Sequence, residues 1–493
     1  MPWPSNCIGH LRPGEPRASK FVGYDASHVA EVRISADDLI EIAERLRPHL
    51  RSMSAPLAVL AKNGVTALVG RTLANRLAVP LVSINPLLAP NEMAHILGDC
   101  GSVDLLVEEQ LHAVAEDALR MTGTQAPTLL LSDAEPLEEE QELLYLGASR
   151  GRFAPEDIGA TLIYTSGTTG APKGCLRTAD QEYARARELI STYSISERDQ
   201  QLLACPLAHS APGIFVRAAH AAGASSVILA RFRAPHFWRV CKRLRRAFFF
   251  LVPTQYLRLL EGYQSESVPE SVRVCIVAGA PLPARLHRNL IQWLGPKRLW
   301  QFYGSSETGT ISIAPPGSPV DASVGLLAPD VELEIRDESG VLCTPGDIGE
   351  MFVRSPTVMS GYRGHSAATG FVSVGDLGYQ DKGGRLFLVD RMHDTIITGG
   401  VNVYPAEVEA ALLSHEDVRG AVVVGLQDED WGQRVVALVA TSQPCTAKAL
   451  REHCRPILAR YKIPKEVHFF ELDEMPIGAS GKPLRRSARA MLL

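Results

Sequence analysis

The pattern between residues 56 and 107 constrains the fold more than any other part of the chain. Three short apolar runs lie there, at residues 57–61, 79–84 and 103–107, and they are predicted strands. The intervening segments 65–78 and 91–99 have the apolar spacing of helices. Short apolar strands separated by helices are typical of βαβ units, which build parallel sheets. The sequence therefore predicts an α/β fold class.

The rest of the chain divides into three further stretches. The α/β pattern continues over residues 161–313, a strand-rich and turn-rich stretch covers 331–389, and the pattern starts anew beyond Arg391. We expect a large N-terminal domain, residues 1–391, of α/β subdomains with parallel sheets plus a β-rich subdomain. A small α+β C-terminal domain, residues 392–493, should follow it. A chain of 493 residues can bury a large core without disulfides or metals.

Charge and composition exclude several classes of function. The chain has 50 Lys+Arg and 55 Asp+Glu, a net charge of −5, which argues against a nucleic-acid-binding surface. The basic stretch 231–250 is interpreted as an exposed amphipathic helix that leads into a buried strand. We therefore expect no nucleic acid among the partners.

The cysteines and the apolar runs indicate the cellular compartment in which the protein is expected. The nine cysteines are scattered and form no CxxC pair, which is typical of a reducing compartment and gives no zinc motif. No apolar run reaches the roughly 18–20 residues of a membrane span, and residues 1–10 lack the pattern of a signal peptide. A cytoplasmic protein is the expectation, as a monomer or a homodimer.

The segment LIYTSGTTGAPKG, residues 162–174, indicates phosphate binding. A predicted strand runs into a loop of hydroxyl and glycine residues and then into Lys173. Glycines let backbone N–H groups approach phosphate oxygens, hydroxyls add donors, and the lysine adds a positive charge. The order differs from the GxxxxGK[ST] of the common P-loop, although the physical logic is the same. The hydroxyl donors are Thr165, Ser166, Thr168 and Thr169.

This segment resembles the phosphate loop of the adenylate-forming (AMP-binding) superfamily, which includes acyl-CoA synthetases, peptide-synthetase adenylation domains and luciferases. Four further segments resemble the motifs of that family in the same order, and the resemblance extends over residues 57–485. It implies an acyl-CoA synthetase or aryl-acid–CoA ligase whose small C-terminal domain is mobile. The four segments are VAGAPL (277–282), QFYGSSETG (301–309), residues 372–412, and PIGASGKPLRR (476–486).

The resemblance implies a site for ATP and Mg²⁺. Tyr303 would stack on adenine, and Glu307 would bind Mg²⁺ through its carboxylate. Asp376 would accept the ribose hydroxyls and Arg391 would contact the ribose or phosphate, with a plain salt bridge between the two as the alternative. Ser306 stands where threonine is usual and keeps the hydroxyl. The residues expected to bind the nucleotide are Thr165, Ser166, Gly167, Thr168, Thr169, Lys173, Gly279, Ala280, Pro281, Tyr303, Gly304, Ser306, Asp376, Arg391 and Lys482.

The catalytic set implied by the resemblance is Lys482, Glu307, Thr165 and His209. Lys482 has the P-x4-G-K spacing of the mobile catalytic lysine of the family. Positive charge and hydrogen-bond donors are needed where a carboxylate attacks the α-phosphate of ATP, because two anions meet there.

Two glycines and a hinge residue are expected to act in the second half of the reaction, the transfer to CoA. Gly399 and Gly400 resemble the glycines over which the pantetheine arm of CoA passes. His393 stands at the hinge, where the family usually has Asp or Lys. The expected cofactors are therefore ATP, Mg²⁺ and CoA.

The acid pocket should have mostly small walls. Its expected residues are His209–Gly213, Gly279, Ala280 and Thr308–Thr310, and no acidic or basic chain among them other than His209 demands a charged tail. We therefore expect an aryl or medium-length acyl acid, with an aryl acid favoured because small walls accept a planar ring.

The expected function is activation of a carboxylic acid to acyl-AMP with release of pyrophosphate, followed by transfer of the acyl group to the thiol of CoA. Two departures from the family, His393 and Ile463, leave open transfer to a carrier-protein thiol, an amine or another small nucleophile. A catalytically silent binding protein is the third hypothesis. The retained Lys173, Glu307 and Lys482 argue against it.

Overall fold

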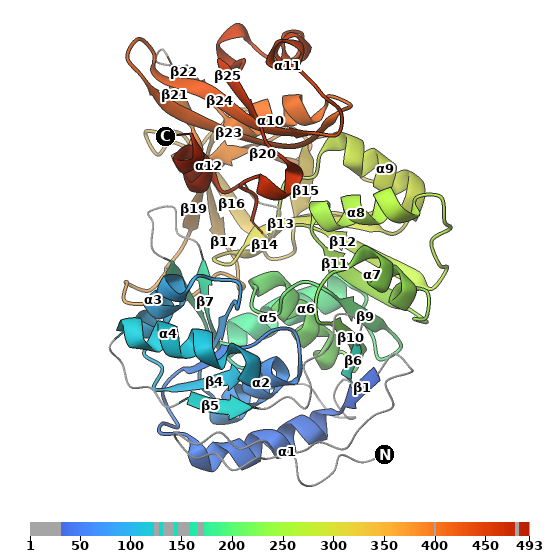
Figure 1. The fold of residues 1–493 in the computed structure, drawn as a ribbon, viewed down its shortest axis with the longest axis vertical. Helices are drawn as coiled ribbons and strands as arrows, with labels where there is room; N and C mark the ends of the chain where they lie inside the picture. Colours follow the sequence, from blue (N-terminus) through green and yellow to red (C-terminus); the bar gives the residue numbers. More distant parts are fainter. Residues whose placement is uncertain are drawn as a thin grey trace.

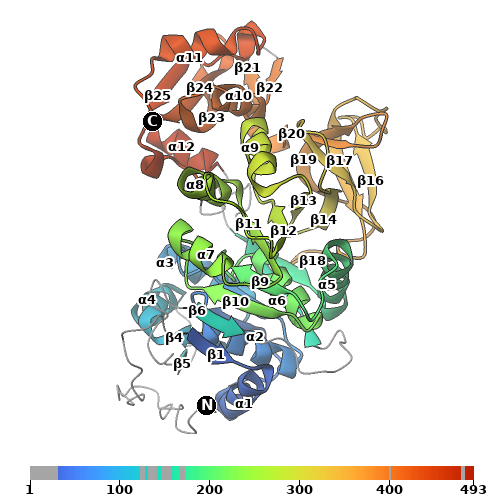
Figure 2. The same cartoon turned by 90° about the vertical axis from the view of Figure 1, so that its right-hand side faces the viewer.

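The computed structural model describes residues 31–122, 128–131, 142–145, 157–165, 172–398, 401–478 and 483–492. Three sheets organise these residues, and helices pack on the sheets (Figure 1). The described residues from β21 (Ile396–Thr398) onward lie at one end of the molecule and α1 (Ala36–Leu46) lies at the other, as Figures 1 and 2 show from two directions. No helix in the described parts of the chain is long and apolar enough to cross a membrane.

The seven-stranded sheet has the order β18-β8-β7-β3-β2-β4-β5. The five strands from β7 to β5 are parallel, whereas β8 and β18 are antiparallel to their neighbours. Its strands are β2 (Leu57–Leu60), β3 (Leu81–Ile84), β4 (Asp104–Glu108), β5 (Thr128–Leu131), β7 (Thr161–Thr165), β8 (Lys173–Arg177) and β18 (Gly361–Tyr362). The associated helices are α2 (Val65–Leu77), α3 (Pro90–Cys100) and α4 (His112–Thr122). The βαβ pattern predicted for residues 56–107 is confirmed.

The thirteen-stranded sheet has the order β1-β6-β10-β9-β11-β12-β13-β14-β15-β20-β19-β17-β16. It is parallel from β10 to β13 and antiparallel from β13 to β16. The parallel half comprises β9 (Gln200–Leu203), β10 (Ser225–Leu229), β11 (Ala247–Leu251), β12 (Val272–Val277) and β13 (Leu299–Ser305), next to β1 (Glu31–Ile34) and β6 (Glu142–Tyr145). The antiparallel half comprises β14 (Gly309–Ala314), β15 (Ser323–Leu327), β16 (Glu332–Arg336), β17 (Gly349–Arg354), β19 (Val372–Gln380) and β20 (Leu386–Arg391).

Six helices belong to this part of the molecule. They are α1 (Ala36–Leu46), α5 (Ala179–Tyr193), α6 (Ser210–Ala221), α7 (Ala234–Cys241), α8 (Pro253–Tyr263) and α9 (Ala284–Leu294). The main apolar core lies between the parallel half of the sheet and helices α5 to α9.

The amphipathic helix predicted in the basic stretch 231–250, ahead of the buried strand, is present as α7 but covers only part of that stretch. Helix α7 covers only eight of these residues, and Phe237 and Trp238 are fully buried within it. The Phe237 ring packs edge-on against Phe249 of β11, with 5.1 Å between the ring centroids. The helix is therefore amphipathic as predicted: its rings remove a large apolar area from water, while Arg233, Arg239 and Lys242 stay exposed. The buried strand that was predicted to follow is confirmed as β11.

The third sheet is formed by the C-terminal part of the chain and has its own apolar core. Its strands are β21 (Ile396–Thr398), β22 (Val401–Val403), β23 (Val418–Asp428), β24 (Gly432–Thr441) and β25 (Glu466–Phe469). Helices α10 (Pro405–Leu413), α11 (Ala447–Cys454) and α12 (Arg485–Met491) pack on it. A large α/β region, a β-rich region and a small α+β region are thus all present, which confirms the predicted fold class.

Candidate functional site

Glu307 lies at the centre of the candidate site, in the turn between β13 and β14. The residue is 9% exposed, and its Oε1 accepts hydrogen bonds from the Thr165 hydroxyl at 3.2 Å and the Tyr362 hydroxyl at 3.0 Å. Thr165 ends β7, where the predicted phosphate loop begins, and Tyr362 ends β18. Three segments distant in the sequence therefore meet at one carboxylate oxygen.

Lys173 lies on the other side of Tyr362. It begins β8, opposite Thr165 in the antiparallel pair of β7 and β8, and its Nζ lies 5.5 Å from the centre of the Tyr362 ring. Burial, and then the charge of Glu307, raise the pKa of the Tyr362 hydroxyl, so this group stays a hydrogen-bond donor at neutral pH. The Tyr362 side chain thus lies between the predicted phosphate-binding lysine and the predicted metal-binding carboxylate.

The loop from residue 304 to 309 holds Glu307 in a defined turn. Ser305 Oγ accepts from the backbone N–H groups of Glu307 at 3.1 Å and Thr308 at 3.2 Å. The backbone carbonyl of Glu307 accepts from Met359 N–H at 2.8 Å. Gly304 is required here, because a Cβ at this position would lie 2.0 Å from the Gly309 carbonyl oxygen.

Asp376 and Arg391 form a second part of the site. They are opposite each other in the antiparallel pair of β19 and β20, and Arg391 Nε lies 3.1 Å from Asp376 Oδ1. The Tyr303 hydroxyl donates a hydrogen bond to Asp376 Oδ2. Burial lowers the pKa of Arg391, but the charges of Asp376, Glu307 and Asp394 act together against it and leave the pKa above its ordinary value. The salt bridge between Asp376 and Arg391, which was the alternative to their roles in nucleotide binding, is therefore present.

The predicted acid-pocket residues lie at the ends of parallel strands. His209 precedes α6 and follows β9, Gly279 to Pro281 follow β12, and Thr308 follows β13. Strands β9, β11, β12 and β13 are consecutive and parallel, so their carboxyl ends share one edge of the sheet. Ligands of open α/β sheets bind at this edge. Thr308 is fully buried, whereas Gly279 and Pro281 are exposed.

Several predicted residues cannot be compared with the structure. Ser166, Gly167, Thr168, Thr169, Gly399, Gly400 and Lys482 lie outside the described residues. His393 belongs to the short helix from Met392 to Asp394, as far as its backbone is described. The chain on either side of Lys482 forms an antiparallel bridge between Ile477 and Pro483.

Sequence reasoning missed two residues at the site, Tyr362 and Arg177. Tyr362 contacts Glu307 and Lys173, and Arg177 at the end of β8 donates to the backbone carbonyl of Ser306. A charged residue within a buried β-strand is the only signal that could have assigned Arg177 to the site. No local pattern in the sequence assigns Tyr362 to it. The position of Tyr362 depends on the pairing of β18 with β8.

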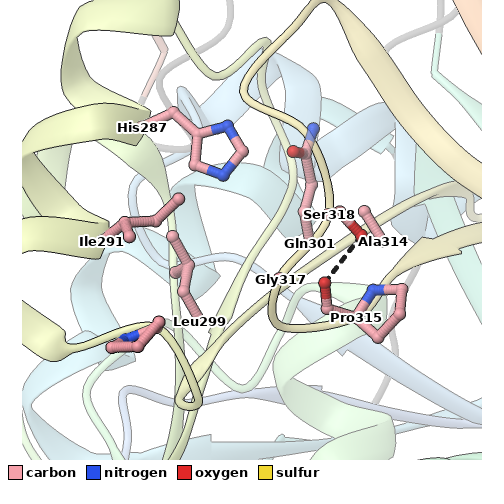
Figure 3. Close-up of a pocket in the computed structure, with 9 residues that line it drawn as sticks. His287, Ile291, Leu299, Gln301, Ala314, Pro315, Gly317 and Ser318 are labelled. Atoms are coloured by element: carbon pink, nitrogen blue, oxygen red, sulfur yellow. Dashed lines mark hydrogen bonds between the residues drawn. The ribbon is translucent and has the colours of Figure 1, made fainter.

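A small cavity lies elsewhere, between α9 and the strands β13 and β14 (Figure 3). Its volume is about 10 Å³, which is the space of about one water molecule. Ser318 Oγ donates to the Pro315 carbonyl at 2.7 Å on its rim. None of the predicted site residues lines this cavity, so it is not the candidate ligand site.

Comparisons with known proteins show which family the chain belongs to. The model of the AMP-binding enzyme family matches residues 15–363, and that of the AMP-binding enzyme C-terminal domain matches residues 407–482. A 2-succinylbenzoate–CoA ligase of Bacillus subtilis is 32% identical over 459 residues, which is 91% of this chain and 90% of the relative. The enzyme of the same name from Bacillus licheniformis is 36% identical over 342 residues, 67% of this chain and 69% of the relative.

Solved structures show the same likeness. The o-succinylbenzoate CoA synthetase (MenE) of Bacillus subtilis, in complex with the acyl-adenylate OSB-AMP, has a TM-score of 0.77 and 30% identity, with 93% of this chain and 95% of that chain covered. The same synthetase has also been solved with ATP and a magnesium ion. The amide bond synthetase McbA of Marinactinospora thermotolerans has a TM-score of 0.79 and 27% identity, with 94% and 97% covered. The chain therefore belongs to the family of AMP-binding enzymes, the adenylate-forming family that its motifs resemble.

Proposed function

We propose that this protein is an AMP-forming acid–CoA ligase. It activates a carboxylic acid with ATP, releases pyrophosphate, and transfers the acyl group from acyl-AMP to the thiol of CoA. Family membership and the names of the relatives support this activity. The observation that carries it is the contact of Glu307 with Thr165, which joins the predicted metal-binding carboxylate to the predicted phosphate loop.

The proposed acid is an aromatic acid of the 2-succinylbenzoate kind. The Bacillus subtilis relative, which spans 91% of this chain, carries that name, and its synthetase has been solved with the corresponding acyl-adenylate. The small residues at the carboxyl ends of β12 and β13, Gly279, Ala280 and Thr308, are compatible with a planar ring.

The residues around Glu307 fit a Mg²⁺ ion. The carboxylate and the Thr165 hydroxyl offer hard oxygen atoms, the ligand type that Mg²⁺ prefers. In the described part of the chain Glu307 forms no ion pair with a lysine or arginine, so its charge is not neutralised directly. When bound with ATP, Mg²⁺ would neutralise charge on the phosphates.

Each remaining residue has a proposed role toward ATP. Lys173, Thr165 and the hydroxyls of the following loop would donate to the phosphates. Asp376 would accept the ribose hydroxyls, and Arg391 would hold that carboxylate in place. Lys482 would reach the α-phosphate from the C-terminal domain. Loss of one such charged donor typically costs about 2.7–4 kcal/mol of transition-state stabilisation.

The proposed domain division is 1–391 and 392–493, with His393 at the hinge. The C-terminal core consists of residues from Ile396 onward, and the two family models match on either side of the boundary. Rotation of the small domain would let Lys482 serve the first half-reaction and Gly399 and Gly400 the second. The compartment we propose is the cytoplasm, where ATP and CoA are supplied and where the eight described cysteines, all free, stay reduced.

An amine acceptor is the second candidate for the second step. The similarity to the amide bond synthetase McbA over 94% of this chain favours it. A carrier-protein thiol is a further candidate acceptor, because His393 and Ile463 depart from the residues usual in the family.

A panel of acids tests the proposed function. The purified protein is given ATP, Mg²⁺ and one acid at a time, and pyrophosphate release is followed, with 2-succinylbenzoate, benzoate and octanoate as the first members. We expect release with 2-succinylbenzoate to exceed that with the other two. Release that is independent of any acid would contradict acid activation, and a preference for octanoate would contradict the aryl assignment.

A further inference from the structure

Arg177 is the last residue of β8, and its side chain is completely buried. Its guanidinium points to backbone carbonyls of two other segments. Nε and Nη2 donate to the Ser306 carbonyl at 3.0 and 2.5 Å, and Nη1 donates to the Thr357 carbonyl. One side chain thus joins the strand that follows the phosphate loop to both segments that surround Glu307.

The two segments that Arg177 contacts are themselves joined. Met359 N–H donates to the Glu307 carbonyl at 2.8 Å, and the Thr357 hydroxyl donates to the Thr308 carbonyl at 2.9 Å. The backbone carbonyls of the turn that contains Glu307 therefore accept hydrogen bonds both from residues 357–359 and from Arg177. Among the residues that the structure describes, the Glu307 side chain is hydrogen-bonded to the hydroxyls of Thr165 and Tyr362 alone, so its position depends on the backbone of this turn.

Strand β8 connects this contact to the phosphate-binding residues. Lys173 begins the strand and Arg177 ends it, and the strand is paired with β7 on one side and β18 on the other. A strand paired on both sides is a rigid element, and four residues of it span about 13 Å. The backbone positions of Lys173 and Arg177 are therefore fixed relative to each other.

The charge of Arg177 is unusual for its surroundings. Burial, and then the neighbouring Arg185, lower its pKa to about 10, so it is still charged at neutral pH. A buried guanidinium costs stability unless it is hydrogen-bonded, and here carbonyl oxygens are its hydrogen-bond acceptors. Lysine could not replace it, because an ammonium group is a point charge and lacks the planar fork that reaches two carbonyls at once.

We propose that Arg177 is a positioning residue for Glu307: its buried guanidinium joins the strand that bears Lys173 to the turn that bears Glu307, and so sets the place where Mg²⁺ and ATP bind together. This inference rests on the proposed function. It concerns binding of the metal–nucleotide complex in the first half-reaction. The second half-reaction starts from acyl-AMP and CoA, needs no triphosphate, and should not depend on Arg177.

The experiment compares three variants with the wild type: Arg177→Met, Arg177→Lys and the control Arg217→Met. Arg217 is also a buried arginine, 6% exposed, and lies 3.5 Å from Glu182, but it is on α6 and has no contact with the turn of Glu307. The first readout is Mn²⁺ binding to the complex of enzyme and ATP, measured by electron paramagnetic resonance without acid. The second readout is thioester formation from supplied acyl-AMP and CoA.

Both Arg177 variants should bind Mn²⁺ about 10- to 100-fold more weakly than the wild type, the usual effect of removing an outer partner of a metal ligand. Thioester formation from acyl-AMP should stay within about twofold of the wild type. Arg217→Met should lower the melting temperature and leave Mn²⁺ binding unchanged.

Three results would overturn the proposal. Wild-type Mn²⁺ affinity in Arg177→Met would show that the contact does not position Glu307. An equal fall of both readouts would show a general loss of folding, and wild-type affinity in Arg177→Lys would show that charge alone matters. A wild-type protein that binds no ATP and converts no acyl-AMP would instead refute the proposed function.

Discussion

Asp376 and Arg391 are opposite each other on adjacent antiparallel strands, and Arg391 Nε lies 3.1 Å from Asp376 Oδ1. The other oxygen of the carboxylate accepts from the Tyr303 hydroxyl. A carboxylate has about four lone-pair sites, so Asp376 can accept ribose hydroxyls while it keeps both protein partners. The salt bridge and the ribose-binding role predicted from the sequence are therefore compatible.

Asp376→Asn should weaken ATP binding and leave acid binding unchanged. The substitution removes a charged acceptor, and hydrogen bonds to charged groups contribute about 1.5–3 kcal/mol, so the KM for ATP should rise about 10- to 100-fold. Acid-dependent pyrophosphate exchange measures both KM values. Asp381→Asn is the matched control, since Asp381 pairs with Arg385 where the same two strands meet but lies outside the site. An unchanged KM for ATP in Asp376→Asn would contradict the ribose role.

Tyr362→Phe should raise the Mg²⁺ concentration needed for half-maximal pyrophosphate exchange. The variant keeps the ring beside Lys173 and removes only the hydroxyl that donates to Glu307. Loss of about 1.5 kcal/mol corresponds to about a tenfold change. Tyr379→Phe is the control, because the Tyr379 ring stacks on Phe387 in the β-rich region. Equal Mg²⁺ dependence in the two variants would show that the Tyr362 hydroxyl has no part in holding Glu307.

Glu188→Gln should make stability less dependent on pH. Burial raises the pKa of Glu188 to about 7, and its Oε1 is buried without a hydrogen-bond partner. The folded state then binds more protons than the unfolded state between pH 4.5 and 7, so this group lowers the free energy of unfolding as the pH rises through that range. The loss is at most about 3 kcal/mol.

Urea unfolding at pH 5 and pH 7.5 measures this effect. The difference in unfolding free energy between the two pH values should be smaller in Glu188→Gln than in the wild type, with the variant gaining stability at the higher pH. A variant with the same pH dependence as the wild type would show that Glu188 is ionised normally in the folded protein.

Arg485→Met should destabilise the C-terminal part of the molecule. Arg485 begins α12, three residues after Lys482, and donates to both oxygens of the buried Glu409 at 3.0 Å and to Asp394 at 3.1 Å. Removal of one partner leaves a buried charge uncompensated, which costs about 3–5 kcal/mol.

A second substitution separates this cause from lost packing. Arg485→Met combined with Glu409→Gln removes the buried charge and should recover a large part of the lost unfolding free energy, measured by urea titration. A double variant that is less stable than Arg485→Met would contradict a charge-based origin.

The fold was predictable where local pattern and burial agree. Strands β2, β3 and β4 are buried along most of their length, so they read as apolar runs in the sequence. Helix α7 is amphipathic as its pattern indicates, with Arg239 exposed and the rings of Phe237 and Trp238 buried, but its pattern does not show that Phe237 packs on Phe249 of β11. Periodicity describes one face of a helix and does not report what packs on the other.

The candidate site, like the fold, was predictable only in part from the sequence. Thr165, Lys173 and Glu307 lie in motifs with several diagnostic residues in a row, and the structure brings them together around Tyr362. Tyr362 and Arg177 have no such neighbours. Tyr362 belongs to a two-residue strand, β18, that pairs with β8 from nearly two hundred residues away, and Arg177 contacts carbonyls more than a hundred residues away, so no local signal encodes these contacts.

The most direct measurement follows one acyl group through both steps. Enzyme in excess is mixed with radiolabelled 2-succinylbenzoate, ATP and Mg²⁺, quenched, and analysed, and CoA is then added to a parallel sample. We predict acyl-AMP that accumulates to at most the concentration of the labelled acid and is converted to the CoA thioester and AMP when CoA is added, with acyl-AMP formed about 100- to 1,000-fold more slowly by Lys482→Ala. Absence of acyl-AMP in the wild type, or acyl-AMP that CoA does not consume, would contradict the assignment as an acid–CoA ligase.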